Sequence, residues 1–123
     1  NSPFVPIGYT GWYPIPQAVF DRLADRPAEV ADRGEMTPLP RMSSGPLLYL
    51  FNYSVTAPFR KTDVSRRMLT GLARDVRDAA PRGLAAITVS DDGARVARRF
   101  GMHPAGRVSI GAGNEVAYVR RGG

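Results

Sequence analysis

The sequence predicts an α+β or α/β fold: a single mixed sheet whose central pair of parallel strands is flanked by helices. Two apolar runs, Leu47–Val55 and Leu84–Ser90, have the length and composition of strands that are covered on both faces. Between them, residues 64–79 place apolar side chains on one face of a helix. A helix that joins two buried strands favours a right-handed parallel unit, so we expect this unit to form the centre of the sheet.

The chain begins with a stretch that is rich in proline and aromatic residues. Residues 1–15 hold prolines at a density that excludes a helix or a central strand. We therefore expect an ordered, extended segment that lies across the domain and packs its aromatic side chains. Trp12 and Tyr13 have a second interpretation, because two adjacent aromatic residues can also form a platform for a ligand.

A short helix and a long irregular stretch follow. Pro16–Arg26 carries apolar residues at helical spacing and is bracketed by prolines, which predicts a helix. Residues 27–46 are polar and are interrupted repeatedly by glycine and proline. We expect at most one short edge strand there, near Glu35–Met42.

A second, shorter helix is expected after the second apolar run. Asp91 or Asp92 would cap it, because aspartate is a favoured N-cap residue. Its inner face would carry Val96 and Phe100, and Gly101 would end it.

The chain ends with a predicted hairpin. Its strands are expected at Val108–Ile110 and Glu115–Arg120. Residues 111–114, of sequence Gly-Ala-Gly-Asn, have the composition of the turn between them.

Composition sets limits on the function. A chain of 123 residues with 43% apolar residues suits one folded domain. It has no cysteine, which excludes disulfides and thiolate chemistry and favours a cytoplasmic location. No apolar run approaches the ~20 residues that span a bilayer, so we expect no membrane partner. Because the chain begins with Asn1 rather than Met, we expect a processed chain or one piece of a longer protein.

The net charge of +6 comes almost entirely from arginine, since Lys61 is the only lysine. One interpretation is an acidic partner, and the other is a high-GC genome that encodes arginine wherever a cation is tolerated. We do not expect nucleic acid, because aromatic and basic residues are not interleaved. The arginines on which such binding would rest are Arg95, Arg98, Arg99, Arg107, Arg120 and Arg121.

The junction between the first buried strand and its helix is a candidate anion site. A helix N-terminus presents unpaired N–H groups and the positive end of the helix dipole. Cations and small residues cluster at this junction. The candidate binding residues are Val55, Ala57, Arg60, Lys61, Thr62, Asp63, Val64, Ser65 and Arg66.

This junction resembles the acyl-CoA-binding loop of the GNAT N-acetyltransferase superfamily, Arg/Gln-x-x-Gly-x-Gly/Ala. Arg60 matches the leading basic residue, Ser65 is a small residue at the second glycine position, and Asp63 replaces the first glycine. The resemblance implies that acetyl-CoA or another acyl-CoA binds at Ala57–Arg67, with its pyrophosphate against the start of the helix. Asp63 is also a good N-cap, so an ordinary capped helix is the alternative.

A second segment, Ser90–Met102, resembles the family pattern Asn-x-x-Ala-x-x-x-Tyr-x-x-x-Gly-Phe. The tyrosine, which in many members is the general acid for the departing CoA thiolate, is replaced here by Ala97. Any proton donor must therefore come from elsewhere, and Tyr118 and His103 are the catalytic candidates. Glu35 and Glu115 are candidate bases that the sequence does not place. No metal site is expected, because the chain has one histidine and no cysteine.

The resemblance divides the chain into a Pro/Gly-rich segment with one short helix, residues 1–46, and a GNAT-like acyl-CoA-binding core, residues 47–123. The family builds about three strands and two helices before the strand that begins here at Leu47. The substrate-binding half is therefore reduced, missing, or supplied by another copy in a homo-oligomer. The implied function is transfer of an acyl group from acyl-CoA to a small-molecule or peptide amine. The alternative is a catalytically inactive GNAT-fold binding or structural domain.

Overall fold

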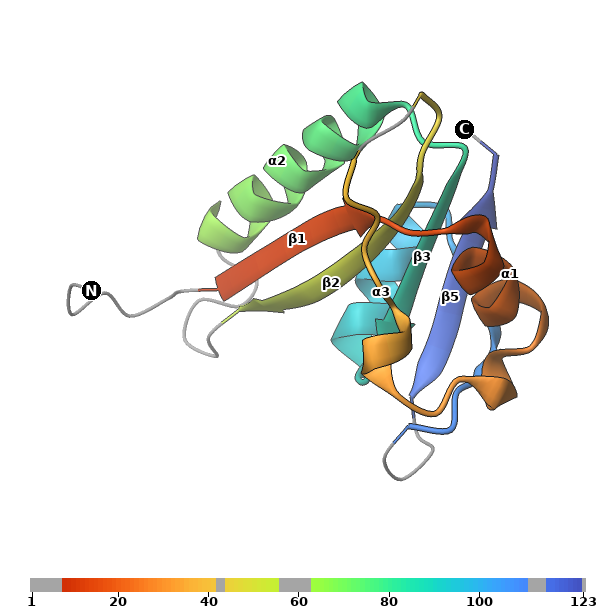
Figure 1. Cartoon of the computed structure of the whole chain (residues 1–123). Coiled ribbons are helices and arrows are strands. Elements are labelled where there is room, and N and C mark those ends of the chain that lie inside the picture. The colour runs from red at the N-terminus through yellow and green to blue at the C-terminus, as the bar shows by residue number, and fades with distance from the viewer. Residues whose placement is uncertain (1–7, 42–43, 56–62, 111–114, 123) are drawn as a thin grey trace, which may run out of the picture.

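The computed structural model describes residues 8–41, 44–55, 63–110 and 115–122 (Figure 1). In these ranges the fold is α+β: one mixed sheet of five strands in the order β1-β2-β3-β5-β4, with three α-helices. The strands are β1 (Gly8–Pro14), β2 (Leu47–Val55), β3 (Gly83–Thr88), β4 (His103–Arg107) and β5 (Val116–Arg121). The helices are α1 (Gln17–Asp25), α2 (Asp63–Ala79) and α3 (Asp91–Arg99), with 3-10 turns η1 (Pro27–Glu29) and η2 (Arg33–Glu35).

The predicted parallel unit is confirmed. β2 and β3 are parallel neighbours, with Leu47 opposite Gly83 and Leu50 opposite Ala86, and α2 joins them. β2–β3 is the one parallel pair of the described sheet, since β1–β2, β3–β5 and β4–β5 are all antiparallel. The two apolar runs lie at the centre because both faces of the sheet are covered by helices.

The two faces of the sheet carry separate apolar cores, and alternate residues of each strand point to opposite faces. Leu48 and Leu50 of β2 face α2 and α3, whereas Leu47 and Tyr49 face α1. The core on the α1 face consists of Ile15, Phe20, Leu23, Val30, Met36, Leu47, Tyr49, Ala85, Ile87, Val108 and Ala117. The core on the α2–α3 face consists of Leu48, Leu50, Leu72, Val76, Leu84, Ala86, Ala97, Met102 and Tyr118.

Of the N-terminal stretch, residues 1–7 lie outside the described residues, and Gly8–Pro14 is extended as predicted. It also pairs antiparallel with β2 as an edge strand, which the sequence did not predict. The end of a strand at the edge of a sheet tolerates proline, and β1 ends at Pro14. The short strand allowed near Glu35–Met42 is not formed by the described residues 36–41. Instead, Met36 is buried in the α1-face core and Leu39 donates its N–H to the Pro14 carbonyl at 2.8 Å.

The third helix forms as expected, but its cap and its inner face differ from the prediction. Ser90 is the N-cap, because its Oγ accepts the Gly93 N–H at 3.1 Å, and both aspartates lie in the first turn. The fully buried residues are Gly93 and Ala97, while Val96 and Phe100 are half-buried. The face shifts because the helix begins one residue after Ser90 and its smallest residues approach the sheet most closely. Gly101, with φ of 81°, ends the helix as predicted.

The hairpin at the C-terminus is present, but its first strand was placed wrongly. β4 is His103–Arg107, whereas Val108–Ile110 lies beyond it, with Val108 buried and its N–H donated to the Glu115 carbonyl. Proline and glycine within the sequence His-Pro-Ala-Gly-Arg disfavour a strand, and β4 accommodates them at the edge of the sheet with a bulge. The turn at residues 111–114 lies outside the described residues.

None of the helices in the described ranges combines the length and the apolar character needed to cross a bilayer.

Candidate functional site: an opening between two parallel strands

The sheet opens between β2 and β3 at their carboxyl ends. The two strands pair over four residues of β2, from Leu47 to Leu50. Beyond Leu50, β2 continues to Val55 beside β1, while β3 continues to Thr88 beside β5. Figure 1 shows the two strands close together at one end and apart at the other. Among the described residues, the β3-facing backbone groups of residues 51–55 therefore have no strand partner.

A β-bulge in β2 accompanies this separation. Tyr9 pairs with Ser54, but Gly11 pairs with Phe51, so two residues of β2 lie opposite one residue of β1. A bulge bends its strand and increases the local twist, which directs the end of β2 away from β3. Bulges of this kind are common beside functional sites because they change the direction of a strand at a fixed position.

Two helices begin where the strands separate. α2 starts at Asp63, beyond the end of β2, and α3 starts at Asp91, beyond the end of β3. Ligands of sheets with parallel strands bind outside the carboxyl ends of the strands, at the point where neighbouring strands diverge. The cap that Ser90 provides satisfies one N–H group of α3 internally. The start of α2 is therefore the better candidate for an anion, in agreement with the sequence.

The structure describes only some of the predicted cofactor-binding residues, and those lie at this opening. Val55 ends β2, and Asp63, Val64, Ser65 and Arg66 form the first turn of α2. Ala57, Arg60, Lys61 and Thr62 lie outside the described residues. Asp63 belongs to the helix rather than preceding it as a cap, and a carboxylate in the first turn is still favoured by the helix dipole.

Tyr118 of β5 is aligned across the sheet with the last residue pair between β2 and β3. It pairs with Ala86, whose partner on β2 is Leu50. Its side chain is 4% exposed and belongs to the α2–α3-face core. The hydroxyl accepts a hydrogen bond from Arg98 Nη2 at 3.3 Å, and the guanidinium lies 5.9 Å from the ring centroid. Tyr118 is thus one strand away from the opening and is held by α3.

His103 lies away from both Tyr118 and the opening. It is exposed at the start of β4, the edge strand. Its partner in the antiparallel ladder is Val119, which packs against the core on the α1 face. Residues opposite each other in a ladder share a face, so His103 and Tyr118 lie on opposite faces of the sheet. The structure does not bring the two catalytic candidates together.

Ala97, at the position of the family's tyrosine, is fully buried against the sheet. A tyrosine there would need volume that the packed core does not provide, and overpacking of this kind costs about 1–3 kcal/mol. The core around Ala97 is therefore built for a small residue.

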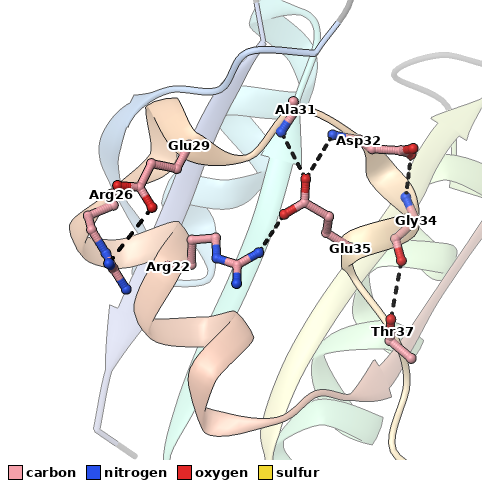
Figure 2. A network of polar contacts seen from close by, with 8 residues as sticks. All are labelled: Arg22, Arg26, Glu29, Ala31, Asp32, Gly34, Glu35 and Thr37. Carbon is pink, nitrogen blue, oxygen red and sulfur yellow. Dashed lines mark hydrogen bonds and ion pairs between the residues drawn. The ribbon is translucent and has the colours of Figure 1, made fainter.

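Glu35, one of the candidate bases, is bound within a structural network on the α1 side (Figure 2). Its carboxylate accepts the N–H groups of Ala31 and Asp32 at 3.1 and 3.2 Å and a hydrogen bond from Arg22. The Ala31 N–H, together with the Arg22 guanidinium and the Asp32 N–H, lowers the pKa of Glu35, although partial desolvation opposes them. These bonds hold the loop between α1 and η2, so Glu35 serves the fold.

A scan of the chain against models of protein families finds no match, and searches of the curated proteins and of the solved structures find none either. The described residues also contain no group of three or more histidine, cysteine or acidic residues placed to bind a metal ion. The functional assignment therefore rests on the site geometry.

Proposed function

We propose that the chain binds acyl-CoA at the opening between β2 and β3, as a GNAT-like protein of the acyl-CoA-dependent N-acetyltransferase type. The observation that carries this proposal is the early end of the β2–β3 ladder at Leu50, beside the bulge in β2 and just before the start of α2. The order of strand, loop, helix, strand and helix agrees with the resemblance of the sequence.

The exposed edge of β2 suits the amide-bearing pantetheine arm of CoA. An extended ligand with amide groups can hydrogen-bond to an unpaired strand edge as an added strand does. Residues 51–55 provide such an edge, and the N–H groups at the start of α2 favour the pyrophosphate. Bound acyl-CoA supplies an activated thioester, which an amine converts to an amide with release of the CoA thiol. The chain's part is to hold the thioester against a backbone donor of β2.

Asp63 is the residue with which to test this site. Its negative charge at the first turn of α2 opposes a pyrophosphate by about 1 kcal/mol at a few ångströms in water. Asp63→Asn should therefore tighten CoA binding several-fold in calorimetry, whereas the matched change Asp78→Asn, near the other end of α2, should leave it unchanged.

Hydrogen exchange locates the ligand independently of affinity. CoA should slow amide exchange at residues 51–55 and at the start of α2. Absence of CoA binding by the native chain and by both variants, or protection confined to other elements, would refute the proposal.

The burial of Ala97 favours a second candidate function, a binding domain that retains the opening without transfer chemistry. With acetyl-CoA and an amine, the two candidates differ in whether free CoA thiol appears. Because the chain has no cysteine, a thiol reagent reports only the CoA released. Thiol release above the rate without protein supports the transferase, and binding without release supports the binding domain.

A further inference from the structure

A groove lies between α2 and α3, on the face of the sheet opposite α1. Two adjoining cavities of about 540 and 400 Å³ form it, and they share Ala73, Arg77, Arg99 and Phe100. Volumes of this size are typical of sites for small organic ligands. The apolar lining of the groove is mostly small side chains, and Phe100 is its aromatic residue.

Four arginines line the groove: Arg74 and Arg77 from α2, Arg99 from α3 and Arg120 from β5. Among the described residues that line it, none is acidic. Arginines at the ends of α2 and α3 agree with the sign of the helix dipole. The dipole does not explain why four of them, from three elements, converge on one groove.

These arginines differ from those elsewhere in the described structure. Arg22, Arg95 and Arg121 form ion pairs with acidic side chains. In the same described ranges, the side chains of Arg74, Arg77 and Arg99 form no hydrogen bond or ion pair. All three are exposed and are free to contact a ligand.

Arg120, the fourth arginine of the groove, is held in place by contacts with the chain around Phe100. Its Nη1 donates to the Phe100 carbonyl at 3.0 Å, and its stem passes Gly101, where an added Cβ would lie 3.2 Å from Arg120 Cδ. Its Nε is buried and has no hydrogen-bond partner within the described residues. A buried donor without a partner is energetically costly.

We propose that this groove binds a small organic phosphate with a flat apolar body, of the size and chemistry of a nucleoside triphosphate. Guanidinium groups bind phosphate oxygens in bidentate geometry, and four of them balance the charge of a triphosphate. The Phe100 ring provides a stacking surface for the base. One aromatic residue and a groove of this volume suit a single nucleotide rather than a polynucleotide.

The groove is separate from the opening described above. It is lined by residues 70–81 of α2 and its end, by the second half of α3 and by Arg120. The opening lies at the first residues of the same two helices. Arg74 is eleven residues from Asp63, about 16 Å along a helix. The groove therefore does not depend on the proposed acyl-CoA function.

The test is a titration of the native chain with a fluorescent ATP analogue, followed by competition with unlabelled ATP, tripolyphosphate and hexaglutamate. Arg77→Ala combined with Arg99→Ala should weaken ATP binding at least tenfold. The control Arg95→Ala combined with Arg107→Ala removes the same charge from residues that do not line the groove, and it should change the affinity less than twofold. Phe100→Leu should weaken ATP several-fold without affecting tripolyphosphate.

Several results would overturn the proposal. Equal losses in the two double variants would show attraction by net charge alone, and no saturable ATP binding would show no site. Tripolyphosphate binding as tightly as ATP would exclude a role for the apolar body, and displacement of ATP by lower concentrations of hexaglutamate would indicate an acidic protein partner. Hydrogen exchange at residues 51–55 reports CoA binding at the opening between β2 and β3. If CoA gives no protection there, the acyl-CoA proposal fails, but the result of the ATP titration still decides the groove proposal.

Discussion

The two faces of the sheet use their charged residues differently. On the α1 face, polar side chains are paired: Arg22 with Glu35, Arg121 with Asp25, and Arg82 with Gln17. On the α2–α3 face, arginines surround a groove, and those of them that are exposed have no partner among the described residues. The apolar core on the α1 face also includes Val30, which follows η1, and Met36, which follows η2.

This difference separates charges that support the fold from charges that are available for a ligand. The Glu35 network holds the loop between α1 and η2, as Figure 2 shows. The side chains of the three exposed arginines of the groove, Arg74, Arg77 and Arg99, make no comparable contact, so the fold does not explain their position. Comparing variants on the two faces tests this division.

The largest difference in stability between variants on the two faces is expected for two phenylalanines, Phe20 and Phe100. Phe20 on α1 is 1% exposed, lies in the α1-face core and carries the Arg121 guanidinium 5.5 Å from its ring centroid. Phe20→Ala should lower the free energy of unfolding by about 3–5 kcal/mol. Phe100→Ala should cost much less, because the Phe100 ring is only half-buried. Denaturant unfolding measures both, and similar losses would contradict the division between the faces.

A pH-dependent effect is expected at Glu35. Because its pKa is lowered below the usual 4.5 in the folded state, its bonds stabilise the protein fully above about pH 4.5. That stabilisation is lost as the pH falls through the folded-state pKa. Glu35→Gln should therefore lower the Tm at pH 7, and the difference from the native chain should shrink below pH 4.5. Glu29→Gln, which removes only an exposed contact of 3.8 Å with Arg26, is the control.

The smallest effect on stability is expected in the groove. Arg74→Ala removes an exposed side chain without a partner in the described ranges, and alanine is a good helix former. The free energy of unfolding should stay within about 0.5 kcal/mol of the native value. A loss above 1 kcal/mol would show that the arginines of the groove support the fold after all.

Local sequence patterns were sufficient to predict an element where its own residues determine its type. The parallel pair and the three helices follow from apolar runs, helical spacing and flanking prolines or glycines. The pairing of Gly8–Pro14 was not predictable in this way, because its two glycines and its terminal proline disfavour a strand in general, although the edge of a sheet accepts them. For the same reason, the sequence placed the strand at Val108–Ile110, whereas the structure has it at His103–Arg107.

The candidate site depends still more on tertiary structure. The junction before Asp63 is visible as a motif, but the opening beside it results from where the β2–β3 ladder ends. The groove results from arginines far apart in the chain, such as Arg77 and Arg120, which the sheet brings together.

The sequence by itself determined the types of the central elements and the parallel connection between β2 and β3, because these depend on periodicity and on loop length. Only the tertiary structure decided the edge strands, the end of the ladder at Leu50 and the partners of each arginine. These features depend on which backbone and side-chain groups meet across the sheet, and such meetings leave no local pattern in the sequence.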